Sequence, residues 1–330
     1  MMKVLEYKVT FHTPAFLGNA EQAGQWRTPP FKAQLRQWWR VAYAARCGFN
    51  VNIGAMRREE GTLFGHAWLE DDCDEKGNKV AARKSLVRIR LGNWKLGDLK
   101  TAPNIGTISI GKNSLPAVLY SGYGPIEPGP RLKSSAAIQS MAEAPFSIAF
   151  PEGKYIEDAL ALMSSYGTLG GRSRNGWGSY LLSGELPEVG PPLVDWEMAL
   201  EHDWPRGIGQ DAKGPLIWHT ASYGRWEDAM HSLAQARAGM RRAVPDRLLL
   251  AYPDTRGVMQ GWAKNERVPN SLRFKVRKID DQFIGVIFHM PCRPAEALWE
   301  KLTPQKQKEL PTNFAAAHGF LDNQFNRADA

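Results

Sequence analysis

Hydrophobic and polar residues alternate over residues 4–11, the first strand-length stretch of the chain. A period of two is typical of a half-buried β-strand, which we expect to end at Thr13-Pro14. Residues 28–48 instead repeat their apolar positions every three to four residues, begin with prolines and end at a glycine, as an amphipathic helix does. A second, shorter helix is predicted over residues 52–68.

The same two periods continue through the rest of the chain. They predict strands over residues 85–94, 115–124, 144–150 and 180–185, a loop over 129–140, and a helix over 155–169. Residues 186–194 are rich in proline and typical of a linker. After it, the pattern predicts a helix over 225–244, two strands over 270–290 with a turn at Asp280-Asp281, and the start of a further helix over 294–310.

Each half of the chain thus repeats one order: strand, helix, strands, helix, strand. This order predicts an α+β fold of two tandem ferredoxin-like (RRM-like) domains with antiparallel sheets. A chain of 330 residues is long enough for two such domains. The linker divides them into an N-terminal domain over residues 1–188 and a C-terminal domain over residues 189–330.

The charge of the chain favours an anionic partner. Its 42 Lys and Arg residues against 34 Asp and Glu give a formal charge of +8, which suits a polyanion better than an acidic membrane surface. No stretch approaches the roughly 18 apolar residues of a membrane span, and the N-terminus lacks a signal-peptide layout. The three cysteines are far apart and odd in number, which fits a reducing compartment. We therefore expect a cytoplasmic protein.

The sequence contains no metal-binding pattern. Cys292 follows His289 by three residues, but two ligands do not make a zinc site. The seven histidines form no pair at three- or four-residue spacing. We therefore expect neither a metal nor a cofactor.

The first predicted helix has a cationic ridge beside its apolar face. On a helical wheel the apolar face holds Phe31, Leu35, Trp38, Ala42 and Ala45, and the ridge holds Lys32, Arg36, Arg40 and Tyr43, with Trp39 at the border. Such a ridge is either a solvated basic face or a surface for an anion. Trp26 and Arg27, just before the helix, favour the second interpretation.

The loop "GTLGGRSRNGWGS", residues 167–179, is a second candidate surface. Gly171 and Gly176 have the spacing of the start of a P-loop, but Trp177 and Gly178 stand where that motif requires Lys and Ser or Thr. A simple turn needs one or two glycines, whereas five would let backbone N–H groups approach phosphates. Arg172 and Arg174 would then neutralise phosphates, and Trp177 would stack on a base or pack under the loop.

These two segments supply the candidate RNA-binding residues. They are Arg27, Lys32, Arg36, Arg40, Gly170, Gly171, Arg172, Arg174, Asn175 and Trp177. One residue is a candidate for chemistry: a histidine near bound RNA can act as a base for cleavage through the 2′-hydroxyl group. His12, at the end of the first strand, has that position, or is simply a partly buried residue at a strand end.

The residues of these segments also resemble a known family. "TPAFLGNAEQAGQWRTPPFKAQLRQWWRVAYAAR" followed by "EEGTLFG" resembles the N-terminal half of RAMP-superfamily proteins of type III CRISPR effector complexes. The pairing of "PPFKAQLRQWWR" with "LGGRSRNGWGS" most resembles the first-numbered subunit of the Cmr (type III-B) complex. In that family both motifs fall in the first of two ferredoxin-like domains. The resemblance is strong over residues 10–70 and 160–180.

The resemblance implies a non-catalytic subunit at one end of an RNA-guided assembly for antiviral defence. Its partners would be CRISPR guide RNA, target RNA and other RAMP subunits. An alternative is a metal-independent CRISPR RNA-processing endoribonuclease that uses His12, although the C-terminal glycine-rich loop of those enzymes is not found. A third possibility is a structural adaptor whose basic surface meets acidic proteins. A binding subunit is expected to bind RNA in a salt-sensitive way. An endoribonuclease is expected to cleave RNA and to lose this activity on His12→Ala. An adaptor is expected to bind RNA weakly.

Overall fold

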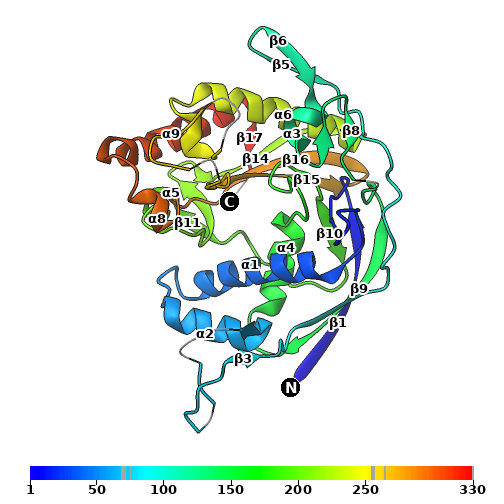
Figure 1. Ribbon diagram of the computed structural model, residues 1–330, viewed down its shortest axis with the longest axis vertical. Coiled ribbons are helices and arrows are strands. Elements are labelled where there is room, and N and C mark those ends of the chain that lie inside the picture. Colours follow the sequence, from blue (N-terminus) through cyan, green and yellow to red (C-terminus); the bar gives the residue numbers. More distant parts are fainter. Residues whose placement is uncertain (68–71, 75, 135, 254–256, 264, 329–330) are drawn as a thin grey trace.

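A computed structural model describes residues 1–67, 72–74, 76–134, 136–253, 257–263 and 265–328 of the chain. It is a mixed α/β fold with several antiparallel sheets, two of which have four strands (Figure 1). Among the described residues, no helix has the length and apolar character needed to cross a membrane.

The first four-stranded sheet belongs to the N-terminal half. Its strands are β1 (Met2–Phe11), β4 (Arg88–Leu91), β9 (Glu143–Pro151) and β10 (Tyr180–Ser183), in the order β10-β1-β9-β4. Two helices, α1 (Thr28–Arg46) and α4 (Ile156–Tyr166), pack together. The alternation predicted for the first strand is confirmed, because Tyr7, Val9 and Phe11 are buried in one cluster with the apolar face of α1.

The second four-stranded sheet belongs to the C-terminal half. Its strands are β14 (Ile217–Tyr223), β15 (Leu272–Ile279), β16 (Gln282–His289) and β17 (Asn326–Arg327), in the order β15-β16-β14-β17. Helices α6 (Trp226–Ala243) and α9 (Pro304–Gln324) pack on each other and on this half of the core. The turn predicted between β15 and β16 is confirmed, since Asp280 and Asp281 join them with φ of 46° and 63°.

The remaining elements are the 12-residue helix α2 and strands and helices of two to six residues. They are α2 (Ile53–Phe64), β2 (His66–Ala67), β3 (Ala82–Arg83), β5 (Thr107–Ile110), β6 (Asn113–Pro116), α3 (Ala117–Gly122), β7 (Ile126–Glu127), β8 (Arg131–Leu132), β11 (Leu193–Asp195), α5 (Trp196–Ala199), β12 (Ile208–Asp211), β13 (Gly214–Pro215), α7 (Arg247–Leu250) and α8 (Glu296–Trp299). The pair β11–β12 is parallel and so departs from the expected antiparallel sheets.

The segment 115–124 is not the strand that the sequence predicted. It ends β6 and then forms the helix α3, in which Ala117, Val118, Ser121 and Gly122 are buried. These positions follow the spacing of a helical face, and a short apolar run does not distinguish a strand from a helix by its period. Helix α3 packs against α6, so this part of the N-terminal half contributes to the core of the C-terminal half.

The two halves meet along α4 and the second sheet. Tyr166 at the end of α4 makes an edge contact with Phe288 of β16, with ring centroids 5.3 Å apart. In Figure 1 the helices α1 and α4 lie directly below the sheet of β14, β15 and β16. The glycine-rich loop, residues 167–179, follows α4 and therefore runs along this junction.

Candidate nucleic-acid interface

The cationic ridge of α1 is tied to α2 through one buried carboxylate. Glu60 is 2% exposed and accepts hydrogen bonds from Arg36 and, at 2.8 Å, from Nε of Arg40. Glu60 lies on the buried face of α2 because it follows Met56 by one helical turn. Both arginine side chains remain 40% exposed, so two cations share one anion and the ridge keeps a net positive charge.

The other two candidates of this region lie at the start of α1. Arg27 is its N-cap residue, and the guanidinium group donates to the carbonyl oxygen of Gly18. Lys32 is half-buried, and burial together with the neighbouring Arg36 lowers the pKa of its ammonium group. No carboxylate among the described residues is paired with Lys32, so its charge stays available to an anion.

Contacts inside the protein require the glycines of the loop. A Cβ atom at Gly178 would lie 1.9 Å from the carbonyl oxygen of Leu169, and one at Gly170 would lie 2.7 Å from that of Phe16. Both glycines have positive φ, 62° and 93°, which side chains disfavour. The N–H of Gly171 donates to the carbonyl of Phe16 at 3.0 Å. The close approach is thus between parts of one chain, a different reason from the approach of phosphates that we expected.

Trp177 takes the second of the two roles that the sequence left open. Its side chain is fully buried and packs under the loop against Phe16 and Trp226, with ring centroids 5.3 and 6.2 Å away. A ring in this position presents no face to a base in solution. The prediction that Trp177 contacts RNA is therefore wrong, because its indole is buried in the apolar core.

The arginines of the loop point to two different sides. Arg172 is exposed and donates to the carbonyl of Tyr123. Arg174 donates through Nη1 to the carbonyl of Asn270 at 2.9 Å, next to the start of β15. The next residue, Asn175, forms a parallel β-bridge with Phe274 of β15. This bridge attaches the end of the loop to the second sheet.

Strand β15 presents three cations to the junction of the halves. Leu272, Phe274 and Val276 are buried in the C-terminal core, and the alternate positions Arg273, Lys275 and Arg277 face the other way. Lys275 is 1% exposed, and its Nζ donates to the carbonyls of Ser164, Gly167 and Tyr180 at 2.7, 2.7 and 2.8 Å. Nε of Arg277 donates to the carbonyl of Ser165 at 3.0 Å. The C-terminal end of α4 therefore supplies acceptors for Lys275 and for Nε of Arg277, whereas Nη2 of Arg277 is buried without a hydrogen-bond partner among the described residues.

Arg273 is the cation on this face of β15 for which the described residues supply no acceptor. Its Nε atom is buried and has no hydrogen-bond partner among them. Burial and the adjacent Arg174 lower the pKa of Arg273 to about 9, and burial lowers the pKa of Arg174 as well. Neither arginine is paired with a carboxylate in the described part of the chain. Two neighbouring guanidinium groups without an anion are what a bound phosphate would stabilise.

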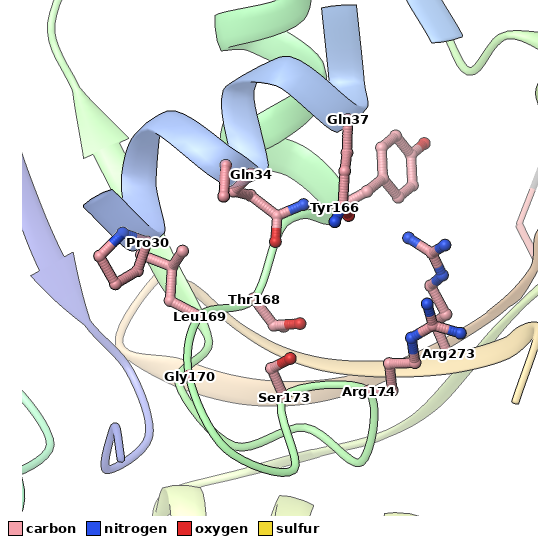
Figure 2. Close-up of a pocket in the computed structure, with 11 residues that line it drawn as sticks. Pro30, Gln34, Gln37, Tyr166, Thr168, Leu169, Gly170, Ser173, Arg174 and Arg273 are labelled. Carbon is pink, nitrogen blue, oxygen red and sulfur yellow. The ribbon is translucent and has the colours of Figure 1, made fainter. Parts of the chain in front are cut away.

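These two arginines lie in a crevice between the halves. Three adjoining pockets, of about 230, 190 and 220 Å³, all include Arg174 and Arg273 in their walls; we call them together the central crevice. Figure 2 shows the two guanidinium groups side by side, across from the amides of Gln34 and Gln37 on α1. The crevice therefore offers charge and neutral hydrogen-bonding groups on facing walls.

The central crevice brings together only part of the predicted site. Arg40 of α1 and Arg174 of the loop line the same pocket, and Trp204, which is only partly buried, lines it too. Sequence reasoning named the first two but missed Arg273 and Trp204. Alternation along "LRFKVRK" was the available signal for Arg273, because it puts three cations on one face of a strand. No local pattern distinguishes Trp204.

His12 is enclosed between β1 and β15. It is 3% exposed, and its Nδ1 lies 3.3 Å from the carbonyl oxygen of Val276. Burial, with a smaller effect from Lys275, lowers the pKa of His12 to about 4. In this position the imidazole lies in the interior and stays neutral near pH 7, so it does not meet the geometric requirement for a base acting on bound RNA.

Acidification is expected to destabilise the protein through its buried histidines. The pKa values of His12 and His318 are about 4 in the folded chain and near 6.5 when unfolded. The unfolded chain binds more protons between these values, so the free energy of unfolding falls as pH falls through this window, by about 1.4 kcal/mol per unit for each group. Urea unfolding at pH 7, 6, 5 and 4.5 measures this, and His12→Gln is expected to flatten the dependence. An equally steep dependence in His12→Gln would contradict the assignment to His12.

His289 is part of a buried hydrogen-bonded chain rather than a zinc site. Its Nε2 lies 3.0 Å from Oγ of Ser271, and its Nδ1 lies 3.0 Å from Nε2 of His318. Burial holds the pKa of His289 well below its usual value. Among the described residues, no cluster of three or more His, Cys, Asp or Glu side chains is arranged to hold a metal ion.

Comparisons with known proteins identify similar folds. No protein-family model matches the chain, and no curated protein matches its sequence. The structure is similar to the apo crystal structure of Cmr1 from Pyrococcus furiosus, with 15% identity, 97% of each chain covered and a TM-score of 0.44. It is also similar to a chain of the type III-B Cmr-beta complex bound to cognate target RNA, with 10% identity, 95% of this chain and 99% of that chain covered, and a TM-score of 0.49. Both similarities extend over nearly the whole length of the chain.

Proposed function

We propose that this chain is a non-catalytic RNA-binding subunit of a type III-B CRISPR effector complex. It contacts guide or target RNA at one end of the assembly and lies beside other RAMP subunits. The motif resemblance over residues 10–70 and 160–180 supports the placement in such a complex. The burial of His12, the one candidate base, supports binding without cleavage.

One observation carries the RNA-binding role: the paired arginines of the central crevice. Arg174 and Arg273 lie side by side without a carboxylate partner in the described chain, and Nε of Arg273 is buried without an acceptor. Holding two like charges together costs free energy, which a phosphate between them offsets. Arg40 adds a third cation, and the partly exposed indole of Trp204 adds a surface on which a base can stack. Single-stranded RNA supplies both chemical groups.

We infer that the two halves are tandem ferredoxin-like units, with the boundary near residues 188 and 189. In the order of the chain, the first sheet runs 4-1-3-2, and the second sheet has the same order when read from β17. Each has a helix after its first strand and another after its third. This strand order and these helices support the split β-α-β arrangement of ferredoxin-like domains. The contact of α3 with α6 crosses the boundary.

Salt-sensitive RNA binding that depends on the crevice tests this function. Anisotropy of a fluorescein-labelled single-stranded RNA gives the affinity of the full chain at several salt concentrations. We expect Arg174→Gln with Arg273→Gln to weaken binding roughly tenfold or more. The slope of log K against log salt is expected to fall by about 0.7, because the two arginines hold one phosphate between them and each phosphate contact on a single strand contributes about 0.7.

A matched pair of exposed arginines provides the control. Arg46 and Arg225 both face carboxylates, Asp158 and Glu227, and replacing both by Gln removes the same charge outside the crevice. Their loss is expected to leave affinity within about threefold, a smaller effect of overall charge. Equal weakening by both double variants would show that net charge, and not the crevice, binds RNA. RNA cleavage by the parent protein would contradict the non-catalytic assignment.

A further inference from the structure

A second basic surface lies on the opposite side of the glycine-rich loop from the central crevice. It is a pocket of about 420 Å³ formed by the segment after α3, and we call it the Tyr123 pocket. Its walls are Tyr123, Gly124, Ile126, Glu127, Pro128, Arg131 and Lys133. Arg172 borders it, since a Cβ atom at Gly124 would lie 3.5 Å from its Nη2 atom.

Tyr123 presents an aromatic ring to solvent from a fixed backbone. The residue is 53% exposed, and its carbonyl oxygen accepts a hydrogen bond from Nε of Arg172. It follows directly after α3, whose last residue Gly122 packs against Ile126 and the buried Trp177. An exposed ring is costly in water but loses little entropy on binding when its backbone is held. This combination suits a stacking surface.

The charges around the ring favour an anion. Arg172, Arg131 and Lys133 are exposed cations, and Glu127 is the single carboxylate in the pocket wall. Glu127 pairs with Arg131 at 3.3 Å, which leaves Arg172 and Lys133 without a carboxylate among the described residues. An aromatic face flanked by two such cations matches a nucleotide, whose base stacks while its phosphates meet the charges.

We propose that the Tyr123 pocket is a base-stacking subsite for single-stranded RNA. Tyr123 stacks on one base, and Arg172 and Lys133 contact the flanking phosphates. This inference rests on the proposed function and extends the RNA path past the crevice. Arg172 and Arg174 are two residues apart, so their Cα atoms are at most about 7.6 Å apart. One strand can therefore meet both sides of the loop.

Substitution of Tyr123 combined with abasic RNA tests the subsite. Anisotropy with the full chain and a labelled single-stranded RNA is expected to show that Tyr123→Ala weakens binding about tenfold, because stacking is worth that much per base. Tyr123→Phe keeps the ring and is expected to bind within about twofold of the parent. An RNA with one abasic position in the contacted register should bind the parent and Tyr123→Ala equally. Trp94→Ala removes another ring, also 53% exposed, outside the pocket and is expected to change nothing.

The outcomes separate this inference from the proposed function. Weakening by the crevice variant, with Tyr123→Ala binding like the parent, overturns the subsite and leaves the function standing. Absence of salt-sensitive RNA binding by the parent overturns both. Equal effects of Tyr123→Ala and Tyr123→Phe would show that the hydroxyl group, and not ring stacking, makes the contact. Binding of an acidic peptide that RNA does not displace would assign the pocket to a protein partner and overturn the proposal.

Discussion

Lys275→Met is expected to lower the free energy of unfolding by about 3–5 kcal/mol. The Nζ of Lys275 donates to three carbonyl oxygens, those of Ser164, Gly167 and Tyr180. Methionine keeps the volume of the side chain but leaves these oxygens without that donor, and an unsatisfied buried polar group costs about 1–3 kcal/mol. Burial holds the pKa of Lys275 well below its usual value. The three acceptors nevertheless match the three N–H bonds of an ammonium group.

Replacing a buried charge by an apolar residue is stabilising only when its partners are replaced too. Here the partners are backbone carbonyls that no substitution removes. Lys278 on the same strand is the control, because it pairs with Asp281 at the exposed hairpin tip. Lys278→Met is expected to change stability by less than about 0.5 kcal/mol. Urea unfolding of both variants measures the difference, and a Lys275→Met protein as stable as the parent would contradict the structural role.

Regular periodicity made the main elements predictable from the sequence. The apolar alternation of β1 and the helical spacing of α1 and α4 each pointed to the element that the structure contains. These segments bury one face against a core, and that face fixes the period of the sequence. The prediction of a strand over residues 115–124 was wrong because α3 has only six residues. Over so short a segment, the period of a strand and the period of a helix cannot be distinguished.

The candidate site was harder to predict because its residues pair with residues that are distant in the sequence. Arg36 and Arg40 share the carboxylate of Glu60, which lies 24 and 20 residues further along the chain. Arg273 meets Arg174 only because β15 packs across the end of α4. Local sequence shows that a residue is charged, but pairing depends on tertiary contacts. The composition of the loop therefore identified Arg172 and Arg174 as candidates. It did not predict that their side chains bond to different segments, at Tyr123 and at Asn270.

Trp177→Ala is expected to destabilise the protein by about 3–5 kcal/mol without acting on RNA directly. Removing a buried aromatic side chain loses its transfer free energy and leaves a cavity. The indole packs between Phe16 and Trp226, so the cavity would lie where the loop meets α6. Thermal or urea unfolding measures the loss.

Trp177→Phe separates packing from RNA contact. The smaller ring keeps part of the contacts and removes an indole N–H that is buried without a partner in the described part of the chain, so its expected cost is below about 2 kcal/mol. RNA affinity, measured by anisotropy below the unfolding range, is expected to equal that of the parent. A fall in affinity with unchanged stability would instead mean that the ring leaves the core to stack on a base. Trp177 packs under the loop and so fixes its position. The fixed loop in turn holds Arg172 and Arg174 on its two sides.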